Sequence, residues 1–181
     1  MQDGADDLRF LSAGADALAF YLESDVLFWP LQSESQPLTI GNLLLAQKRV
    51  AAFLGGTDPD ALKAGDQIAQ ARDKRRAAWK RKATSEFHAR MTQYKSALMD
   101  AGEEENTGVN YPVLARLRVI LEILRDEIDS EIHSDNQLTS FDVQLRKLIV
   151  DSDFVWQPQL QDAFPAAKYW FLYAKYARRS A

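Results

Sequence analysis

The sequence predicts an all-α protein, an irregular bundle of about five to seven helices with one long helix over residues 58 to about 100. Apolar residues recur at spacings of three and four along most of the chain, whereas glycine and proline gather in a few short segments. The two runs with strand-forming composition, 148–150 and 154–156, are too short to make a sheet. Because 181 residues is near the size of one domain, we expect a single helical domain over 1–181.

The first helix is expected over about residues 6–23, because its apolar residues follow helical spacing. Those on one face are Leu8, Leu11, Ala15, Leu18 and Leu22. Residues 25–38 then break the periodicity, with Pro30 and Pro37 on either side of a polar stretch. We interpret 25–38 as an irregular connection that lies across the body of the protein.

The next two helices carry the clearest boundary signals in the chain. Thr39 is a good N-cap residue, and Gly55 can adopt the left-handed conformation that closes a helix. Asp58 can cap the following helix, where Pro59 occupies the first position and its missing N–H does no harm. No further proline occurs up to residue 101, so the pattern indicates one long helix or two stacked in line.

The second half of the chain begins with 101–111, which we expect to be an exposed acidic loop. A buried helix at the centre of the bundle is expected over 113–133, followed by a turn at 134–137 and a helix over 138–148. The apolar face of the central helix is formed by Leu114, Leu117, Leu121, Leu124, Ile128 and Ile132. Pro165 can start a last helix.

A basic segment is the strongest charge feature. Residues 71–90 hold eight Lys or Arg and two acids, Asp73 and Glu86, which gives this segment a net charge of +6. Because the net charge of the whole chain is −4, the remaining residues carry −10. The candidate binding residues are Arg72, Arg75, Arg76, Trp79, Lys80, Arg81 and Lys82. Such a segment can bind phosphates of a nucleic acid or an acidic surface. The alternative is a solvated helix face that the acids at 103–105 and 126–131 neutralise.

Two of these arginines, Arg72 and Arg76, fall within the apolar stripe of the predicted long helix. Charged side chains are rarely buried without partners, because desolvation costs several kcal/mol. We therefore expect the helix to leave the core there, to kink, or to meet acidic partners. An unbroken helix of forty residues would be roughly 60 Å long and would overhang a domain with a radius of gyration of roughly 16 Å.

Arg81 and His88 have six residues between them, a spacing similar to that of the arginine and histidine of all-helical HEPN-class ribonucleases. That resemblance implies acid-base work by His88 and phosphate binding by Arg81. Lys82 departs from the motif, which usually has a small polar or acidic residue after the arginine. RNA cleavage is therefore an alternative hypothesis, and the chain is not assigned to that class.

Aromatic residues are concentrated in the C-terminal segment. Trp156, Tyr169, Trp170 and Tyr173 are candidates for a pocket or an interface, since tyrosine and tryptophan are enriched at such places. The alternative is that they pack a docked terminal helix onto the core.

Several function classes are excluded or unsupported. The chain has no cysteine, so it has neither disulfides nor thiolate chemistry. No serine nucleophile elbow, phosphate-binding glycine loop or dinucleotide motif occurs, and Asp129 with His133 lacks a second histidine for a metal. We expect no catalytic set, no metal and no cofactor. The acidic N-terminus and short apolar runs favour a cytoplasmic protein that does not enter membranes.

The leading hypothesis is a non-catalytic protein-interaction or scaffolding module that acts through its helix faces, with a protein partner or as a homo-oligomer. The first alternative is nucleic-acid binding, with or without RNA cleavage, through residues 72–90. The second is an enzyme or carrier whose apolar pocket is lined by the C-terminal aromatics.

Overall fold

The computed structural model describes residues 4–32, 34–102, 110–129 and 132–177. Helices make up most of this part of the chain and the sheet has only two short strands, which confirms the predicted all-α bundle. The elements in chain order are α1 (Gly4–Glu23), α2 (Ile40–Leu54), α3 (Pro59–Lys74), α4 (Arg76–Gly102), α5 (Tyr111–Arg125), α6 (Ile132–Leu148), β1 (Ile149–Asp151), η1 (Pro158–Ala163), α7 (Ala166–Tyr169), η2 (Trp170–Tyr173) and β2 (Ala174–Tyr176).

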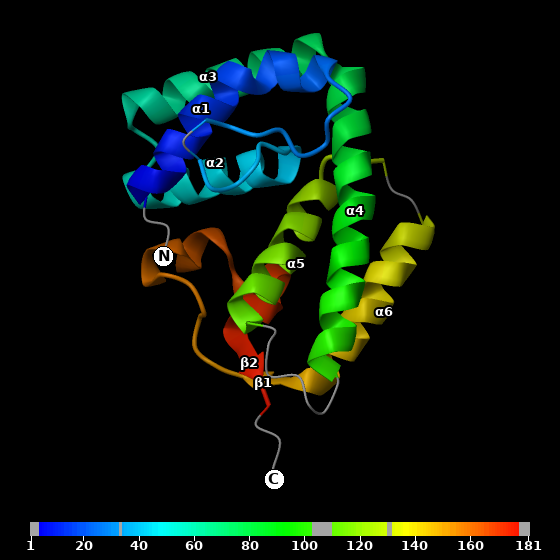
Figure 1. The fold of residues 1–181 in the computed structure, drawn as a ribbon. Coiled ribbons are helices and arrows are strands. Elements are labelled where there is room, and N and C mark those ends of the chain that lie inside the picture. Colours follow the sequence, from blue (N-terminus) through cyan, green and yellow to red (C-terminus); the bar gives the residue numbers. More distant parts are fainter. Residues whose placement is uncertain (1–3, 33, 103–109, 130–131, 178–181) are drawn as a thin grey trace.

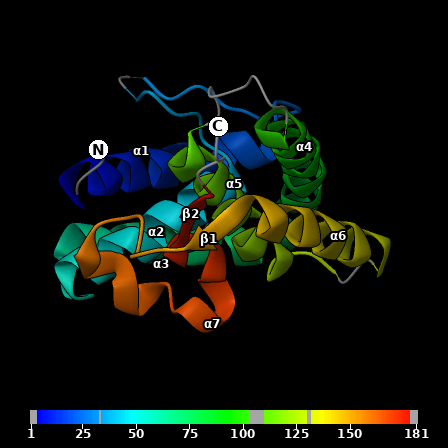
Figure 2. The same ribbon diagram turned by 90° about the horizontal axis from the view of Figure 1, so that it is seen from below.

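The helices form two groups that meet at α2 and α5. In Figure 1, α1, α2 and α3 make an upper layer, while α4 runs down the molecule beside α5 and α6. The view from below in Figure 2 places α1 on one side and η1 with α7 on the opposite side, with α2 and α5 between them. The buried residues of α2 and α5 therefore join the two groups into one apolar core.

The local signals at the starts and ends of α2 and α3 are confirmed. The Thr39 side chain accepts a hydrogen bond from the Asn42 N–H at 3.1 Å, and Gly55 closes α2 with a φ of 67°. Asp58 caps α3 by accepting bonds from the first free N–H groups, and Pro59 is its first residue. These caps satisfy backbone donors that have no partner within the helix.

The long helix expected over 58–100 is divided into α3 and α4 at Arg75. Arg75 has φ −126° and ψ 39°, outside the helical region, and the two helices run in clearly different directions from it (Figure 1). The reason is packing: α3 packs against α1 in the upper layer, whereas α4 packs chiefly against α5 and α6. A kink in this region was one of the expected outcomes, and the bend removes the overhang of a straight helix.

The central helix is also shorter than expected. α5 ends at Arg125 rather than at residue 133, and the predicted turn at 134–137 lies within α6. The chain turns after Arg125 because Asp126 and Glu127 are held by side chains from other elements, Lys168 and Trp79. The deep burial expected for this helix is confirmed for α5.

A small sheet that the sequence did not predict joins two distant segments. β1 and β2 pair antiparallel, with Ile149 opposite Tyr176 and Asp151 opposite Ala174. Pro165 does precede a helix, but α7 is short and gives way to η2 and then to β2. The partner of β1 therefore lies in a segment where a longer helix was expected.

The connection over 25–38 lies across the upper layer as expected (Figure 1). Trp29 and Leu38 form a β-bridge, and the Tyr21 hydroxyl donates to the Leu27 carbonyl at 3.2 Å. Of the expected acidic loop over 101–111, residues 103–109 lie outside the described part of the chain. Tyr111, the last residue of that predicted loop, is buried and begins α5.

The close contact between α2 and α5 gives a testable expectation for Gly41. A Cβ at Gly41 would lie 2.5 Å from Ile120 Cγ2 and 2.9 Å from Glu86 Oε1. We expect Gly41→Ala to lower the free energy of unfolding by about 1–3 kcal/mol through overpacking, measured by chemical denaturation.

Gly65 in α3 is the matched control, because a Cβ there would meet only Gln47 Nε2 at the ordinary distance of 3.5 Å. Gly65→Ala should instead raise the free energy of unfolding by about 0.5–1 kcal/mol, since it removes glycine from a helix interior. Equal effects of the two substitutions would contradict the close approach of α2 and α5 at Gly41.

Candidate anion-binding site

The basic segment over 72–90 is largely paired with acids of the same chain. Arg72 bonds to Glu127 at 2.7 Å, and Lys80 bonds to Asp129 at 2.7 Å. Both acids belong to the 126–131 stretch that was expected to neutralise this segment. Trp79 is buried, and its indole N–H donates to the same Glu127 at 2.9 Å.

The other cations of this segment point in several directions. Arg75 donates to Glu23 of α1 at 2.9 Å. Lys82 is buried, donates to the Val26 carbonyl at 2.6 Å and lies 4.5 Å from the centre of the Tyr21 ring. Burial lowers the pKa of its amine.

Arg76 and Arg81 remain exposed, and Arg76 forms an ion pair with Asp73 at 3.9 Å. His88 is also exposed, on the same helix face as Arg81. A cavity of about 470 Å³ is lined by Arg72, Arg76 and Lys80, but Asp73 and Glu127 line it too. An anion that enters this cavity therefore meets carboxylates as well as cations in its lining.

The four C-terminal aromatics contact different groups of the protein. Tyr169 is buried in the core, and Arg146 lies 3.7 Å above the ring of Trp170. Tyr173 donates its hydroxyl to the Phe164 carbonyl at 3.0 Å. Trp156 lines a cavity of about 360 Å³.

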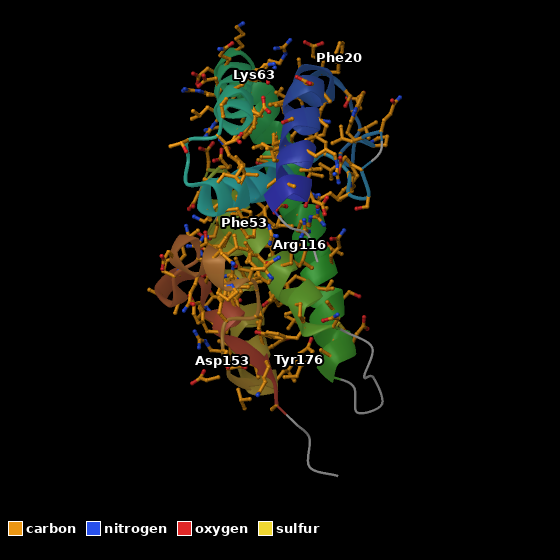
Figure 3. All side chains as sticks on the ribbon, turned by 90° about the vertical axis from the view of Figure 1, so that its left-hand side faces the viewer. Phe20, Phe53, Lys63, Arg116, Asp153 and Tyr176 are labelled. Atoms are coloured by element: carbon orange, nitrogen blue, oxygen red, sulfur yellow. The ribbon has the colours of Figure 1, made fainter. Side chains whose placement is uncertain are left out.

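We call this 360 Å³ cavity the arginine pocket, because three arginines from three helices converge on it. Arg49 comes from α2, Arg90 from α4 and Arg116 from α5. The complete lining is Arg49, Arg90, Gln93, Pro112, Val113, Arg116, Leu117, Trp156 and Gln157. Figure 3 labels Arg116 at the level where the upper layer meets the lower group. The pocket thus lies at the junction of the two helix groups, a common location for ligand sites.

Two of the arginines are held in place by buried carboxylates. Arg49 donates from Nε to Asp7 of α1 at 2.7 Å, and its guanidinium lies 5.4 Å from the centre of the Trp156 ring. Arg90 donates from Nε to Glu86 at 3.3 Å and from Nη1 to Gln93 at 3.1 Å. These bonds fix the direction of each guanidinium.

The third arginine, Arg116, is bound differently. Its Nη2 donates to two amide oxygens, Gln36 Oε1 at 2.7 Å and Asn42 Oδ1 at 3.1 Å. Within the described residues, no carboxylate forms an ion pair with it. Burial, and then the positive charges of Arg90 and Arg49, lower the pKa of Arg116 to about 10. The charged form of Arg116 is therefore less favoured in the folded protein than in water.

The two carboxylates that bond to the pocket arginines, Asp7 and Glu86, do not make the net charge of the pocket negative. Asp7 and Glu86 are both buried, and burial raises the pKa of each above the ordinary carboxyl value. Three guanidinium groups face two carboxylates, which leaves a net charge of +1 even when both acids are ionised. None of the described residues that line the cavity is acidic, so an entering anion meets cations first.

The sequence pattern did not indicate that these three arginines form a binding site. Arg90 was counted in the basic segment but was not a candidate binding residue, and Arg49 and Arg116 were not singled out. The available signal was that Arg49 and Arg116 each interrupt an apolar helix, LLLAQKRVAAFL and VLARLRVIL.

Comparisons of the chain with family models, with curated proteins and with solved structures find no match. Within the described residues, no group of three or more His, Cys, Asp or Glu is arranged to hold a metal ion. None of the described helices combines the length and the apolar character needed to cross a bilayer. The side chains of the arginine pocket are therefore the features that indicate which ligand the protein could bind.

Proposed function

We propose that this protein is a non-catalytic binding protein for an anionic ligand, which it holds with Arg49, Arg90 and Arg116. The observation that carries the proposal is that these three arginines, from three helices, line one cavity whose described lining contains no acid. Guanidinium groups bind carboxylates and phosphates through two parallel hydrogen bonds, and partial burial strengthens such charge-assisted bonds. The cavity volume of about 360 Å³ falls within the range of small-molecule sites.

The lining also supports a role in binding rather than catalysis. None of the described residues around the cavity is Ser, Cys, His, Asp or Glu, the usual nucleophiles and proton-transfer groups. Arginine stays protonated through the physiological range, and even the lowered pKa of Arg116, about 10, keeps it a cation at pH 7. The pocket therefore offers recognition without a proton-transfer group.

The proposal predicts that Arg116→Gln abolishes most anion binding. Glutamine keeps an N–H donor for Gln36 and Asn42 but removes the charge, so affinity for acetate or inorganic phosphate should fall about ten- to a hundredfold. Titration calorimetry at constant ionic strength measures the change. The free energy of unfolding should be unchanged or rise by about 1 kcal/mol, because a disfavoured buried cation is lost.

Arg76→Gln is the matched control, since it removes the same charge from a side chain that is 76% exposed and lies outside the arginine pocket. It should leave anion affinity unchanged. If Arg76→Gln and Arg116→Gln weakened binding equally, the attraction would come from net charge alone and the proposal would be wrong.

The interaction or scaffolding role, the homo-oligomer and the cytoplasmic location inferred from the sequence stay predictions. Large exposed apolar side chains such as Phe20, Leu62 and Met99 lie on different helices, α1, α3 and α4. Light scattering tests the oligomer directly. Nucleic-acid binding through residues 72–90 also stays a prediction, which requires affinity that falls steeply with salt.

A further inference from the structure

We infer that the ligand of the arginine pocket is a monoanion with an apolar body, of the class of aryl- or alkyl-carboxylates; this rests on the proposed anion site. The charge balance is the first argument. With Asp7 and Glu86 both ionised, the three arginines and these two carboxylates leave one positive charge for the ligand. A dianion would then place surplus negative charge beside the buried Asp7 and Glu86, and a neutral molecule would leave Arg116 without an ion-pair partner among the described residues.

The second argument is the apolar wall. Four of the nine lining residues are apolar: Pro112, Val113, Leu117 and Trp156. Val113 is 64% exposed although it lies in the first turn of a deeply buried helix. Val113, Arg116 and Leu117 are three and four residues apart on α5, so the cation and the apolar side chains share one helix face. A charged head on Arg116 therefore brings the rest of the ligand against the apolar wall.

The third argument is size. A cavity of about 360 Å³ holds the volume of about twelve water molecules, which corresponds to a ligand of about a dozen non-hydrogen atoms. Acetate leaves most of that space to water. A molecule such as 4-phenylbutyrate fills it, with the carboxylate toward the arginines and the ring toward Trp156. Gln93 and Gln157 are the polar uncharged residues of the lining.

The test is titration calorimetry at pH 7.5 with four probes: 4-phenylbutyrate, acetate, 4-phenyl-1-butanol and phenyl phosphate. We expect 4-phenylbutyrate to bind at least about tenfold more tightly than acetate, because the ring buries apolar surface. The alcohol, which has the same body without the charge, should bind at least about tenfold more weakly than 4-phenylbutyrate. Phenyl phosphate, a dianion at this pH, should also bind more weakly.

Val113→Ser tests the apolar wall and leaves the three arginines unchanged. Because the Val113 side chain is exposed, we expect this substitution to change the free energy of unfolding little. It should weaken 4-phenylbutyrate about fivefold and leave acetate unchanged. Val143→Ser on α6 is the matched control, because Val143 is 51% exposed and does not line the cavity. It should change neither affinity.

The outcomes separate this inference from the proposed function. If acetate and phosphate bind in an Arg116-dependent manner but the phenyl ring adds nothing, the apolar-body inference is overturned and the anion site stands. If phenyl phosphate binds more tightly than 4-phenylbutyrate, the monoanion inference is overturned. If no probe binds in an Arg116-dependent manner, the proposed function itself fails.

Discussion

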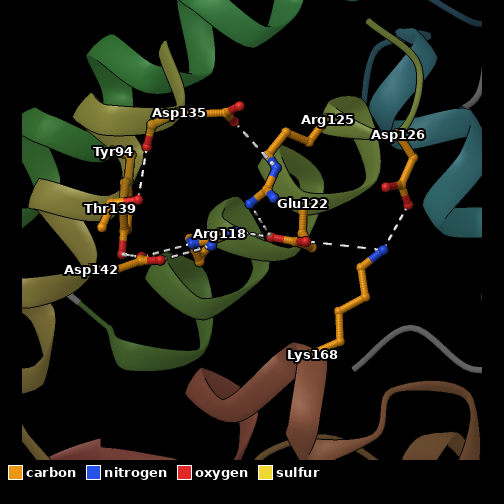
Figure 4. Close-up of polar contacts among 9 residues, drawn as sticks. All are labelled: Tyr94, Arg118, Glu122, Arg125, Asp126, Asp135, Thr139, Asp142 and Lys168. Atoms are coloured by element: carbon orange, nitrogen blue, oxygen red, sulfur yellow. Dashed lines mark hydrogen bonds and ion pairs between the residues drawn. The ribbon is translucent and has the colours of Figure 1, made fainter. Parts of the chain in front are cut away.

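Replacing Arg118 by methionine is expected to lower the free energy of unfolding by about 3–5 kcal/mol, measured by chemical denaturation. Arg118 is 3% exposed and donates to both oxygens of Asp142 at 2.8 Å and to Glu122 at 2.9 Å (Figure 4). Burial opposes its charge, but the bonds and charges of the two acids outweigh it and raise the pKa of Arg118. Methionine would leave two largely buried carboxylates without their shared cation.

Arg125→Gln is the control for this prediction. Arg125 contacts the same Glu122 at 3.6 Å and Asp135 at 3.4 Å, but its side chain is 45% exposed. Solvent-exposed pairs contribute about 0–1 kcal/mol, so the loss should be small. Adding Asp142→Leu to Arg118→Met should recover part of the stability, because it removes one orphaned carboxylate. A loss below about 1 kcal/mol for Arg118→Met alone would contradict the buried network.

This network holds in place the helix that presents Arg116. Arg118 bonds α5 to Asp142 of α6, and Lys168 of α7 reaches Glu122 of α5 at 4.0 Å and Asp126 at 2.7 Å. The Tyr94 hydroxyl adds α4 by donating to Asp142 at 3.3 Å (Figure 4). Residue 116 lies two positions before residue 118, so it points to a different face of α5. One face of α5 fixes the helix, and another faces the pocket.

The parts of the fold that the sequence predicted are those with local causes. The caps at Thr39 and Asp58 depend on backbone groups within three residues, and the closing conformation of Gly55 depends on glycine itself. The apolar spacing of α5 likewise reports a property of one helix. Such signals need no knowledge of what the helix packs against.

The breaks in the helical pattern at Arg75 and after Arg125 have distant causes. Arg75 bonds to Glu23, 52 residues away, and α5 is followed by a turn whose Glu127 accepts from Trp79, 48 residues away. The helical spacing of apolar residues continues through both breaks. The reason is that the apolar side chains on each side have to be buried whether the helix is continuous or broken. Only the three-dimensional packing decides where the chain turns.

The candidate site was hidden for a related reason. A run of cations such as 72–90 is conspicuous in the sequence, yet several of its members bond to acids of the same chain. Arg49, Arg90 and Arg116 are scattered through the sequence and form no charge cluster until α2, α4 and α5 pack together. The densest run of cations in the sequence is therefore largely neutralised by acids of the same chain. The net positive charge of the arginine pocket instead comes from arginines that are far apart in the sequence and close together in the fold.

Replacing Glu86 by alanine is the second substitution with a large expected effect, a loss of about 3–5 kcal/mol in the free energy of unfolding. Glu86 is fully buried on α4 and accepts the N–H of Gly41, in the first turn of α2, at 2.7 Å. It also accepts from Arg90, whose side chain is 12% exposed. Alanine would leave a buried donor and a largely buried cation without their acceptor, as well as a cavity between α2 and α4.

Glu86→Gln separates the hydrogen bond from the charge. Glutamine retains an acceptor for the Gly41 N–H, so its loss at pH 7 should be well below that of alanine. Burial raises the pKa of Glu86 above its ordinary value of 4.5, so the folded protein binds this proton more tightly than the unfolded chain does. Ionisation of Glu86 therefore costs stability as the pH rises above about 4.5.

The glutamine variant lacks that cost, so its stability relative to the parent protein should increase from pH 4 to pH 8. Denaturation curves at pH 4, 6 and 8 measure this difference, and Asp60→Asn in the exposed first turn of α3 is the control. A relative stability that fell with pH would mean that the ionised carboxylate is the favoured form. Arg90 and the N-terminus of α2 would then stabilise the ionised form of Glu86 more strongly than burial opposes it.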